Sequence, residues 1–130
     1  MRIADNLAES TSTFYAELKK LQQIIEEVNK KEKVFILLDE ILRGTNSLDR
    51  HTGSKALIKQ LIFHNAVGII VTHDVELAKV EEDFDDAITN YHFDVQVSAN
   101  DELFFDYKLK EGVCKTLNAS ILMKKIGIEL

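Results

Sequence analysis

The stretch "FILLDEILRGTNSLDRHTG", residues 35–53, runs from apolar residues into two adjacent acids and then into an Arg-Gly-Thr turn. With the preceding valine, the apolar residues read "VFILL". A continuous β-branched and aliphatic run of this kind is typical of parallel strands that are buried on both faces. The two acids, Asp39 and Glu40, therefore stand where a buried strand ends, and two charges at that point require a chemical explanation.

A second run, "AVGIIVT" at residues 66–72, repeats the buried-strand pattern. Between the two runs, apolar residues recur at helical spacing and predict a helix over residues 50–64. A strand, a helix and a strand in this order predict a right-handed crossover unit with parallel strands, so the expected fold class is α/β. Upstream, residues 13–30 predict an amphipathic helix, with apolar positions at Phe14, Leu18, Leu21, Ile25 and Val28.

The last third of the chain has a different pattern. After a short helix predicted over residues 75–82, apolar and polar residues alternate in "NYHFDVQV" and again in "ELFFDYKL", which predicts two half-exposed strands. The turn-like "SAND" between them predicts that they pair as an antiparallel hairpin. Their aromatic residues share one face without interleaved basic residues, so we interpret them as core and not as a base-stacking surface. A terminal helix over residues 118–126 is predicted to end at Gly127.

The composition predicts one compact unit with a single hydrophobic core. The chain has 130 residues, 45% of them hydrophobic, and contains no proline. Its net charge of −6 argues against a broad basic face that would neutralise DNA phosphates. The single cysteine, Cys114, excludes an internal disulfide and makes a reducing cytoplasm the expected location. No apolar run approaches the roughly 18 residues of a membrane-spanning helix, so no membrane segment is expected.

The polar residues that follow the two predicted strands are candidates for one site. In an open α/β sheet, ligands bind beyond the carboxyl ends of the strands. Asp39 and Glu40 follow the first strand, and Thr72 and His73 follow the second, so these side chains line one crevice if the strands are neighbours. Phosphoryl transfer needs such a set, with one carboxylate for Mg²⁺ and another for the attacking water. Taken singly, solvated strand ends and a capping histidine explain the same residues.

In "ESTSTF", residues 9–14, three hydroxyl residues in a row stand directly before the helix predicted over residues 13–30. Free amides and hydroxyls at a helix N-terminus bind anions. An ordinary N-cap needs only one hydroxyl, so the excess favours a phosphate site without requiring one.

Taken together, these segments resemble one family, the MutS-type ATPases of DNA mismatch repair, a branch of the ABC-type P-loop ATPases. "DNLAESTSTFYAEL" resembles the signature loop and its helix, "FILLDE" the Walker B strand, "RGTNSLD" the Arg-Gly-Thr turn and D-loop, and "THD" the Thr-His switch. The similarity continues through "NYHFDV" and "DYKLKEGVCKTLNASILMKKIGI". The resemblance covers nearly the whole chain, with the motifs in the family's order.

The resemblance implies roles for individual residues. Asp39 would position Mg²⁺, Glu40 would activate the hydrolytic water, and His73 would contact the γ-phosphate or that water. Ser12 and Thr13 would reach the nucleotide of the opposite subunit. The remaining implied positions are the D-loop, Asn46 to Asp49, which would lie across the dimer interface, and Gly44, which would let the chain turn sharply.

The sequence also departs from the family. It contains no Gly-x-x-x-x-Gly-Lys-Ser/Thr, so the Walker A phosphate cradle is absent from residues 1–130. We therefore expect the C-terminal portion of one partial P-loop domain, inactive alone and without tight binding of ATP and Mg²⁺. Ser10, Leu42 and Arg50 replace glycines that are frequent in the family, which indicates a divergent branch.

We interpret the chain as the C-terminal half of a cytoplasmic MutS-like ATPase that couples ATP hydrolysis to DNA binding. The expected partners are a second ATPase subunit, in a homodimer, and DNA held by other domains of the parent. Two alternatives remain open. One is another ABC-type ATPase, although its Leu-Ser-Gly-Gly-Gln-like signature is not found in "ESTSTF". The other is a non-catalytic interaction module whose hairpin is a docking edge.

Overall fold

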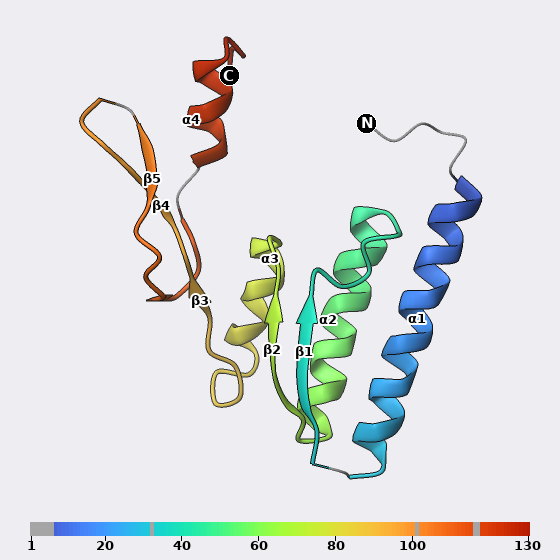
Figure 1. The fold of residues 1–130 in the computed structure, drawn as a ribbon. Helices are drawn as coiled ribbons and strands as arrows, with labels where there is room; N and C mark the ends of the chain where they lie inside the picture. The colour runs from blue at the N-terminus through green and yellow to red at the C-terminus, as the bar shows by residue number, and fades with distance from the viewer. Residues whose placement is uncertain (1–6, 32, 101, 116–117) are drawn as a thin grey trace. The chain divides into compact units, whose positions relative to one another are not determined.

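The computed structural model describes residues 7–31, 33–100, 102–115 and 118–130, and it divides the chain into two compact units (Figure 1). The units are Met1–Val80 and Glu81–Leu130. The expectation of one compact unit is therefore wrong. The buried apolar residues explain the division, because every one found among the described residues lies at or before Val80.

The first unit contains the predicted strand, helix, strand order. Helix α1, Leu7–Asn29, precedes strand β1, Phe35–Asp39, and helix α2, Ser47–Phe63, leads to strand β2, Val67–Val71. The two strands are parallel, with Phe35 opposite Val67 and Asp39 opposite Val71. Helix α3, Val75–Ala78, and the short 3₁₀ helix η2, Lys79–Glu82, follow. The parallel pair with a crossover helix is confirmed.

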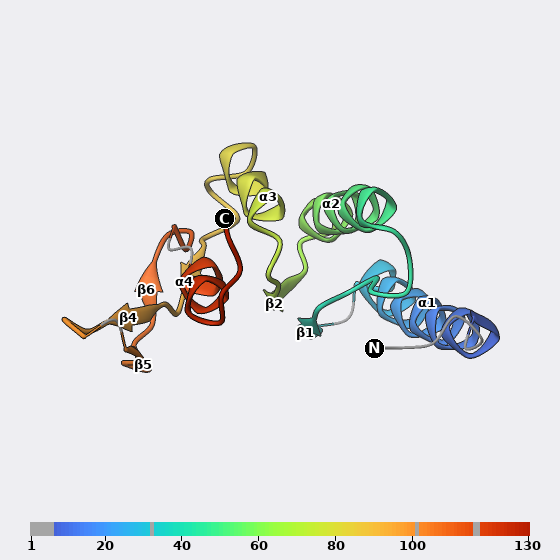
Figure 2. The same ribbon diagram turned by 90° about the horizontal axis from the view of Figure 1, so that it is seen from above.

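Both long helices cover the same face of the two-stranded sheet. Seen along the strands in Figure 2, α1 and α2 lie on one side of β1 and β2. Leu21 and Val28 of α1 and Leu57 and Leu61 of α2 form one buried cluster with the inward residues of β1, Ile36 and Leu38. The apolar stripe of each helix thus packs onto the sheet, and this packing holds the ends of the strands in place.

The other face of the sheet is uncovered among the described residues. Burial alternates along β1, and Leu37 is 70% exposed between buried Ile36 and Leu38. Three large apolar residues of β2 are exposed as well: Val67, Ile69 and Val71. The prediction of strands buried on both faces is therefore wrong for β1 and β2 within the first unit, because both of its long helices pack on one side and none of its described residues covers the other.

Helix α1 begins earlier than predicted. It starts at Leu7, so residues 9–14 lie inside the helix and not in front of it. Ser and Thr cost only about 0.5 kcal/mol each relative to Ala in a helix, and Leu7, Ala8 and Glu9 favour helix formation, so hydroxyl residues alone do not delay its start. The expectation of hydroxyls ahead of a helix N-terminus is wrong.

Helix α2 also begins three residues before the prediction, and its cap explains the difference. The side chain of Asn46 accepts a hydrogen bond from the Asp49 amide at 2.8 Å and donates one to the Asp49 carboxylate at 2.9 Å. Asn46 is therefore the N-cap of α2, and a second hydrogen bond between the two side chains holds it in place. The helix ends before Asn65, whose backbone is left-handed with φ 60°, as is common directly after a helix.

The second unit contains two short antiparallel ladders. Strand β4, Val95–Val97, pairs with β5, Leu103–Phe105, as the predicted hairpin. Strand β3, Tyr91–His92, pairs with β6, Lys110–Glu111. The alternating pattern predicted continuous strands to residue 109, but Tyr107 has φ 55° and interrupts the extended backbone.

The aromatic residues of the two alternating segments are exposed, contrary to the expectation that they form a core. Tyr107 is 84% exposed, and Tyr91, Phe93 and Phe105 are also exposed. Short two-stranded ladders cannot cover aromatic side chains on their own, because they lack a second layer.

Helix α4, Asn118–Lys125, closes the unit near the predicted boundary. Gly127 has φ 98°, and its amide donates to the Lys124 carbonyl at 3.0 Å, which confirms the predicted C-terminal glycine. Cys114 is half-buried and is not part of a disulfide. Within the described residues, no helix combines the length and the apolar character needed to cross a membrane.

Candidate functional site

The carboxyl ends of β1 and β2 bring Glu40 and His73 together. The Glu40 amide donates to the Val71 carbonyl at 2.9 Å, which continues the ladder one residue past β1. The His73 amide then donates to Glu40 Oε1 at 2.9 Å, and His73 Nε2 lies 3.7 Å from the same oxygen. The acids and the Thr-His segment are therefore neighbours in space, as the sequence predicts for adjacent parallel strands.

Asp39 and Glu40 have different surroundings although they are adjacent. Asp39 is the exposed last residue of β1, and it lies on the sheet face opposite to Ile36 and Leu38. The Glu40 side chain is only 13% exposed. The backbone turns sharply at Glu40, where φ is 51°, and again at Leu42, where φ is 60°. Left-handed backbone at such residues costs about 1–3 kcal/mol each, so surrounding contacts must hold this turn.

Arg50 supplies one of these contacts, and sequence reasoning did not assign it a role. Its guanidinium donates to Glu40 Oε2, and its Nε donates to the Ile41 carbonyl at 3.3 Å. Both oxygens of Glu40 thus accept hydrogen bonds, one from Arg50 and one from the His73 amide. The sequence did contain a signal for Arg50. A cation in the first turn of a helix interacts unfavourably with the helix dipole, so a compensating interaction is expected.

The helix that carries Ser12 and Thr13 is anchored to this turn by other residues. The carboxylate of Glu17 in α1 accepts a hydrogen bond from the Leu42 amide. Gly44 lies against α1, where a Cβ at this position would be 2.5 Å from the Cβ of Phe14. Glycine at position 44 is therefore required by close packing, and the left-handed residues of the turn are Glu40 and Leu42.

Ser12 and Thr13 are exposed on α1. Asn46 and Asp49 are likewise exposed, at the start of α2, where they form its cap. The structure therefore brings together Glu40 and His73, places Asp39 beside them in sequence on the exposed sheet face, and leaves the other four predicted residues exposed on α1 and at the start of α2.

A shallow cavity of about 630 Å³ opens beside Glu40. It lies between the start of α2 and the segment that follows β2. Its lining residues are Glu40, Ser47, Leu48, Arg50, His51, His73, Asp74 and Glu76.

His51 and Asp74 form a second polar pair at this cavity, which the sequence did not predict. His51 Nδ1 lies 2.9 Å from Asp74 Oδ2, while Asp74 Oδ1 accepts from the Glu76 and Leu77 amides as the N-cap of α3. Partial burial acts to raise the pKa of Asp74, but the hydrogen bonds from His51 and the Leu77 amide outweigh it, so the pKa is lowered. Asp74 is therefore a structural anion.

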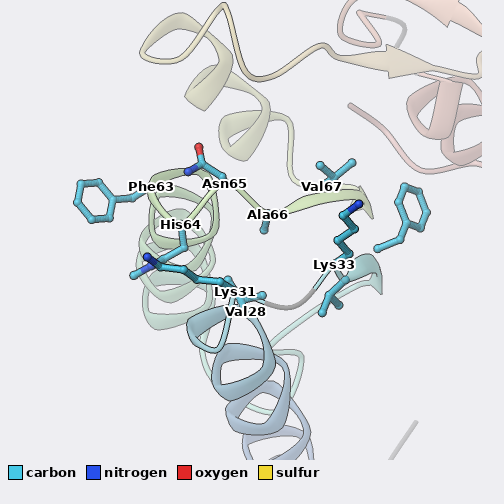
Figure 3. Close-up of a pocket in the computed structure, with 10 residues that line it drawn as sticks. Val28, Lys31, Lys33, Phe63, His64, Asn65, Ala66 and Val67 are labelled. Atoms are coloured by element: carbon cyan, nitrogen blue, oxygen red, sulfur yellow. The ribbon is translucent and has the colours of Figure 1, made fainter.

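A separate cavity of about 700 Å³ lies at the amino ends of the strands (Figure 3). It is formed where the ends of α1 and α2 approach β1 and β2, with Val28 and Ala66 among its apolar residues. Lys31, Lys33, Phe63 and His64 also line it, and in Figure 3 the ring of Phe63 points away from the other labelled side chains. It contains none of the residues expected to act on a nucleotide.

The residues at the carboxyl ends of β1 and β2 offer one carboxylate that could serve as a protein ligand for Mg²⁺. No group of three or more His, Cys, Asp or Glu side chains that could hold a metal occurs among the residues described by the structure. Mg²⁺ bound with a nucleotide usually takes one or two carboxylates and completes its shell with phosphate oxygens and water. The exposed carboxylate of Asp39 matches that requirement, whereas Glu40 is already engaged by Arg50.

Comparison with known proteins identifies the family. The sequence matches the family model of MutS domain V over residues 1–126. The chain belongs to the MutS domain V family. The resemblance based on the Ser-Thr-Phe, Asp-Glu, Arg-Gly-Thr and Thr-His motifs is thereby confirmed.

Individual members give the extent of the similarity. MutS protein homolog 4 of Homo sapiens is 31% identical over 128 residues, which cover 95% of this chain and 13% of that protein. DNA mismatch repair protein MSH3 of Scheffersomyces stipitis is 31% identical over 98% of this chain and 13% of its own length. DNA mismatch repair protein MutS of Methanosarcina mazei is 36% identical over 83% of this chain and 12% of its own. The chain thus spans 12–13% of these relatives.

Proposed function

We propose that the chain is the C-terminal half of a P-loop ATPase domain in a MutS-like protein that couples ATP hydrolysis to DNA mismatch binding and repair. The observation that carries the proposal is the Glu40 carboxylate, held against the His73 amide at 2.9 Å beyond two parallel strands. Family membership and the mismatch-repair names of the MSH3 and MutS relatives support it. Phosphoryl transfer needs a carboxylate fixed in this way to orient water.

Three residues at the edge of the sheet have distinct roles in this proposal. Asp39 holds Mg²⁺ through its exposed carboxylate, and bound Mg²⁺ neutralises phosphate charge. Glu40 orients and deprotonates the attacking water through Oε1, because Oε2 is engaged by Arg50. His73 is 95% exposed, so its ring is free to turn toward the γ-phosphate while its amide keeps Glu40 in place.

A second subunit completes the nucleotide site in this proposal. Ser12 and Thr13 in α1 and Asn46 and Asp49 at the start of α2 are exposed, so another subunit can approach them. We assign these four residues to contacts with the partner's nucleotide in a homodimer. The phosphate cradle is not in this sequence, and DNA is bound by other domains of the cytoplasmic parent protein.

The decisive test is Glu40→Gln in the full-length protein. This change keeps the shape of the side chain but removes the base, so we expect ATP turnover to fall by roughly 10²–10⁴-fold with nucleotide binding retained. Glu76→Gln is the matched control, because Glu76 lines the same cavity and has an exposed side chain paired with Lys79. Unchanged turnover in the Glu40 variant would overturn the proposal and favour a non-catalytic interaction module.

The 130-residue chain provides a second test. Calorimetric titration with MgATP should detect no binding up to millimolar concentration, because the chain lacks the amide cradle and lysine of a P-loop. One-to-one binding would mean that the phosphate site lies elsewhere in this chain.

A further inference from the structure

Arg50 occupies an electrostatically unfavourable place for a cation. It lies in the first turn of α2, where the helix dipole and the free amides carry partial positive charge. The side chain is 31% exposed, so it is only partly solvated. The unfavourable dipole and the partial loss of solvation require a compensating interaction, and Arg50 finds it in the turn after β1.

The guanidinium joins two parts of that turn. One nitrogen donates to Glu40 Oε2, and Nε donates at 3.3 Å to the carbonyl of Ile41, the next residue in the chain. Arginine suits this position because its donors form a rigid planar fork, whereas lysine presents a single ammonium group. Arg50 thus contacts both the side chain of Glu40 and the backbone that directs it.

The two oxygens of Glu40 consequently have different neighbours. Oε2 is held by Arg50, and Oε1 accepts from the His73 amide at 2.9 Å and lies toward the His73 ring. Because a carboxylate oxygen has two lone pairs, Oε1 retains one that can accept a further hydrogen bond. Rotation of the carboxylate would break a charge-assisted hydrogen bond, so this orientation is preferred.

We propose that Arg50 is a positioning residue that clamps Glu40 Oε2 and the Ile41 carbonyl, so that Oε1 faces the attacking water beside His73. The inference rests on the proposed function, because it assigns Arg50 an effect on a step that Glu40 performs. Small errors in the placement of a catalytic group reduce rate strongly, even when binding is intact.

The test compares Arg50→Gln and Arg50→Lys in the full-length protein. We expect Arg50→Gln to lower kcat by roughly 10–100-fold, with the KM for MgATP changed by less than about twofold. Arg50→Lys should recover part of kcat, because an ammonium group can contact Glu40 but cannot reproduce the fork. Lys59→Gln removes the same charge from the same helix away from the cavity and should leave turnover unchanged.

A double-mutant cycle separates positioning from general stabilisation. In a Glu40→Gln background, Arg50→Gln should cause no further loss of kcat, because no base remains to be positioned. A residue that only stabilises the fold would instead lower the melting temperature and the rate in both backgrounds. If Arg50→Gln unfolds the protein, the intermediate kcat of Arg50→Lys is the required result.

The outcomes distinguish the two proposals. Loss of turnover in Glu40→Gln together with unchanged or faster turnover in the Arg50 variants would overturn the positioning role alone. Wild-type turnover in Glu40→Gln would overturn the proposed function, whatever the Arg50 variants show.

Discussion

Replacement of Gly44 by alanine tests how α1 is joined to the turn that carries the acids. The added Cβ would lie 2.5 Å from Phe14 Cβ, 2.9 Å from Cδ2 and 3.0 Å from Cγ. Carbon atoms in contact normally stand about 3.5–4.0 Å apart, so the overlap is about 1 Å. Phe14 Cβ is attached directly to the α1 backbone, so a rotamer change cannot relieve the closest contact.

We expect Gly44→Ala to destabilise the chain by about 1–3 kcal/mol, as overpacking usually does. For a chain of this size, that corresponds to a fall in melting temperature of roughly 5–15 °C. Urea denaturation followed by circular dichroism measures the free energy of unfolding directly, and an unchanged m value would show that the native state is the one affected.

Gly53→Ala is the matched control, since it adds the same methyl group at another glycine of the same unit. Its Cβ would meet only Leu42 Cδ1, at 2.8 Å, which is the mobile end of a side chain. Gly53 lies inside α2, where alanine gains about 0.5–1 kcal/mol over glycine, so we expect stability within about 1 kcal/mol of the wild type. Equal stability of the two variants would refute the packing argument.

Two further predictions follow from the turn and from the cavity. Leu42→Gly relieves a left-handed backbone that costs about 1–2 kcal/mol, but it removes a buried side chain that contributes about 2–5 kcal/mol. Urea denaturation should therefore show a lower free energy of unfolding. A higher free energy of unfolding would contradict the packing of Leu42. Asp74 has a lowered pKa, so its stabilising effect is complete above its ordinary value of 3.8 and is lost as pH falls through the lower folded value. Asp74→Asn should therefore flatten the loss of stability below about pH 4, and superimposable pH profiles for variant and wild type would contradict this assignment.

Local patterns in the sequence predicted the parallel pair and its crossover helix. These patterns are the apolar runs of β1 and β2 and the helical spacing of Leu57 and Leu61. They are local in the sequence, so they can be recognised without knowledge of the rest of the fold. Because the strands are adjacent and parallel, the proximity of Glu40 and His73 follows directly.

Features that depend on long-range contacts were not predictable. Whether Leu37 is buried depends on a covering layer, and the exposed aromatic residues of the second unit show the same dependence. The bond between Arg50 and Glu40 depends on a turn with two left-handed residues, for which neither Glu40 nor Leu42 gives a local signal. The start of α1 was missed because serine and threonine are only weakly unfavourable inside helices.

The uncovered sheet face has a consequence for Asp39, the residue proposed to hold Mg²⁺. Asp39 is on the same side of β1 as Phe35 and Leu37, at the end of an apolar surface that water now reaches. Any layer that covers this surface also strips water from the Asp39 carboxylate, and a desolvated anion needs a cation more strongly than a solvated one does. In the proposed function, a layer that covers the apolar face would therefore strengthen the binding of Mg²⁺ at Asp39, so that core packing and metal affinity would rise together.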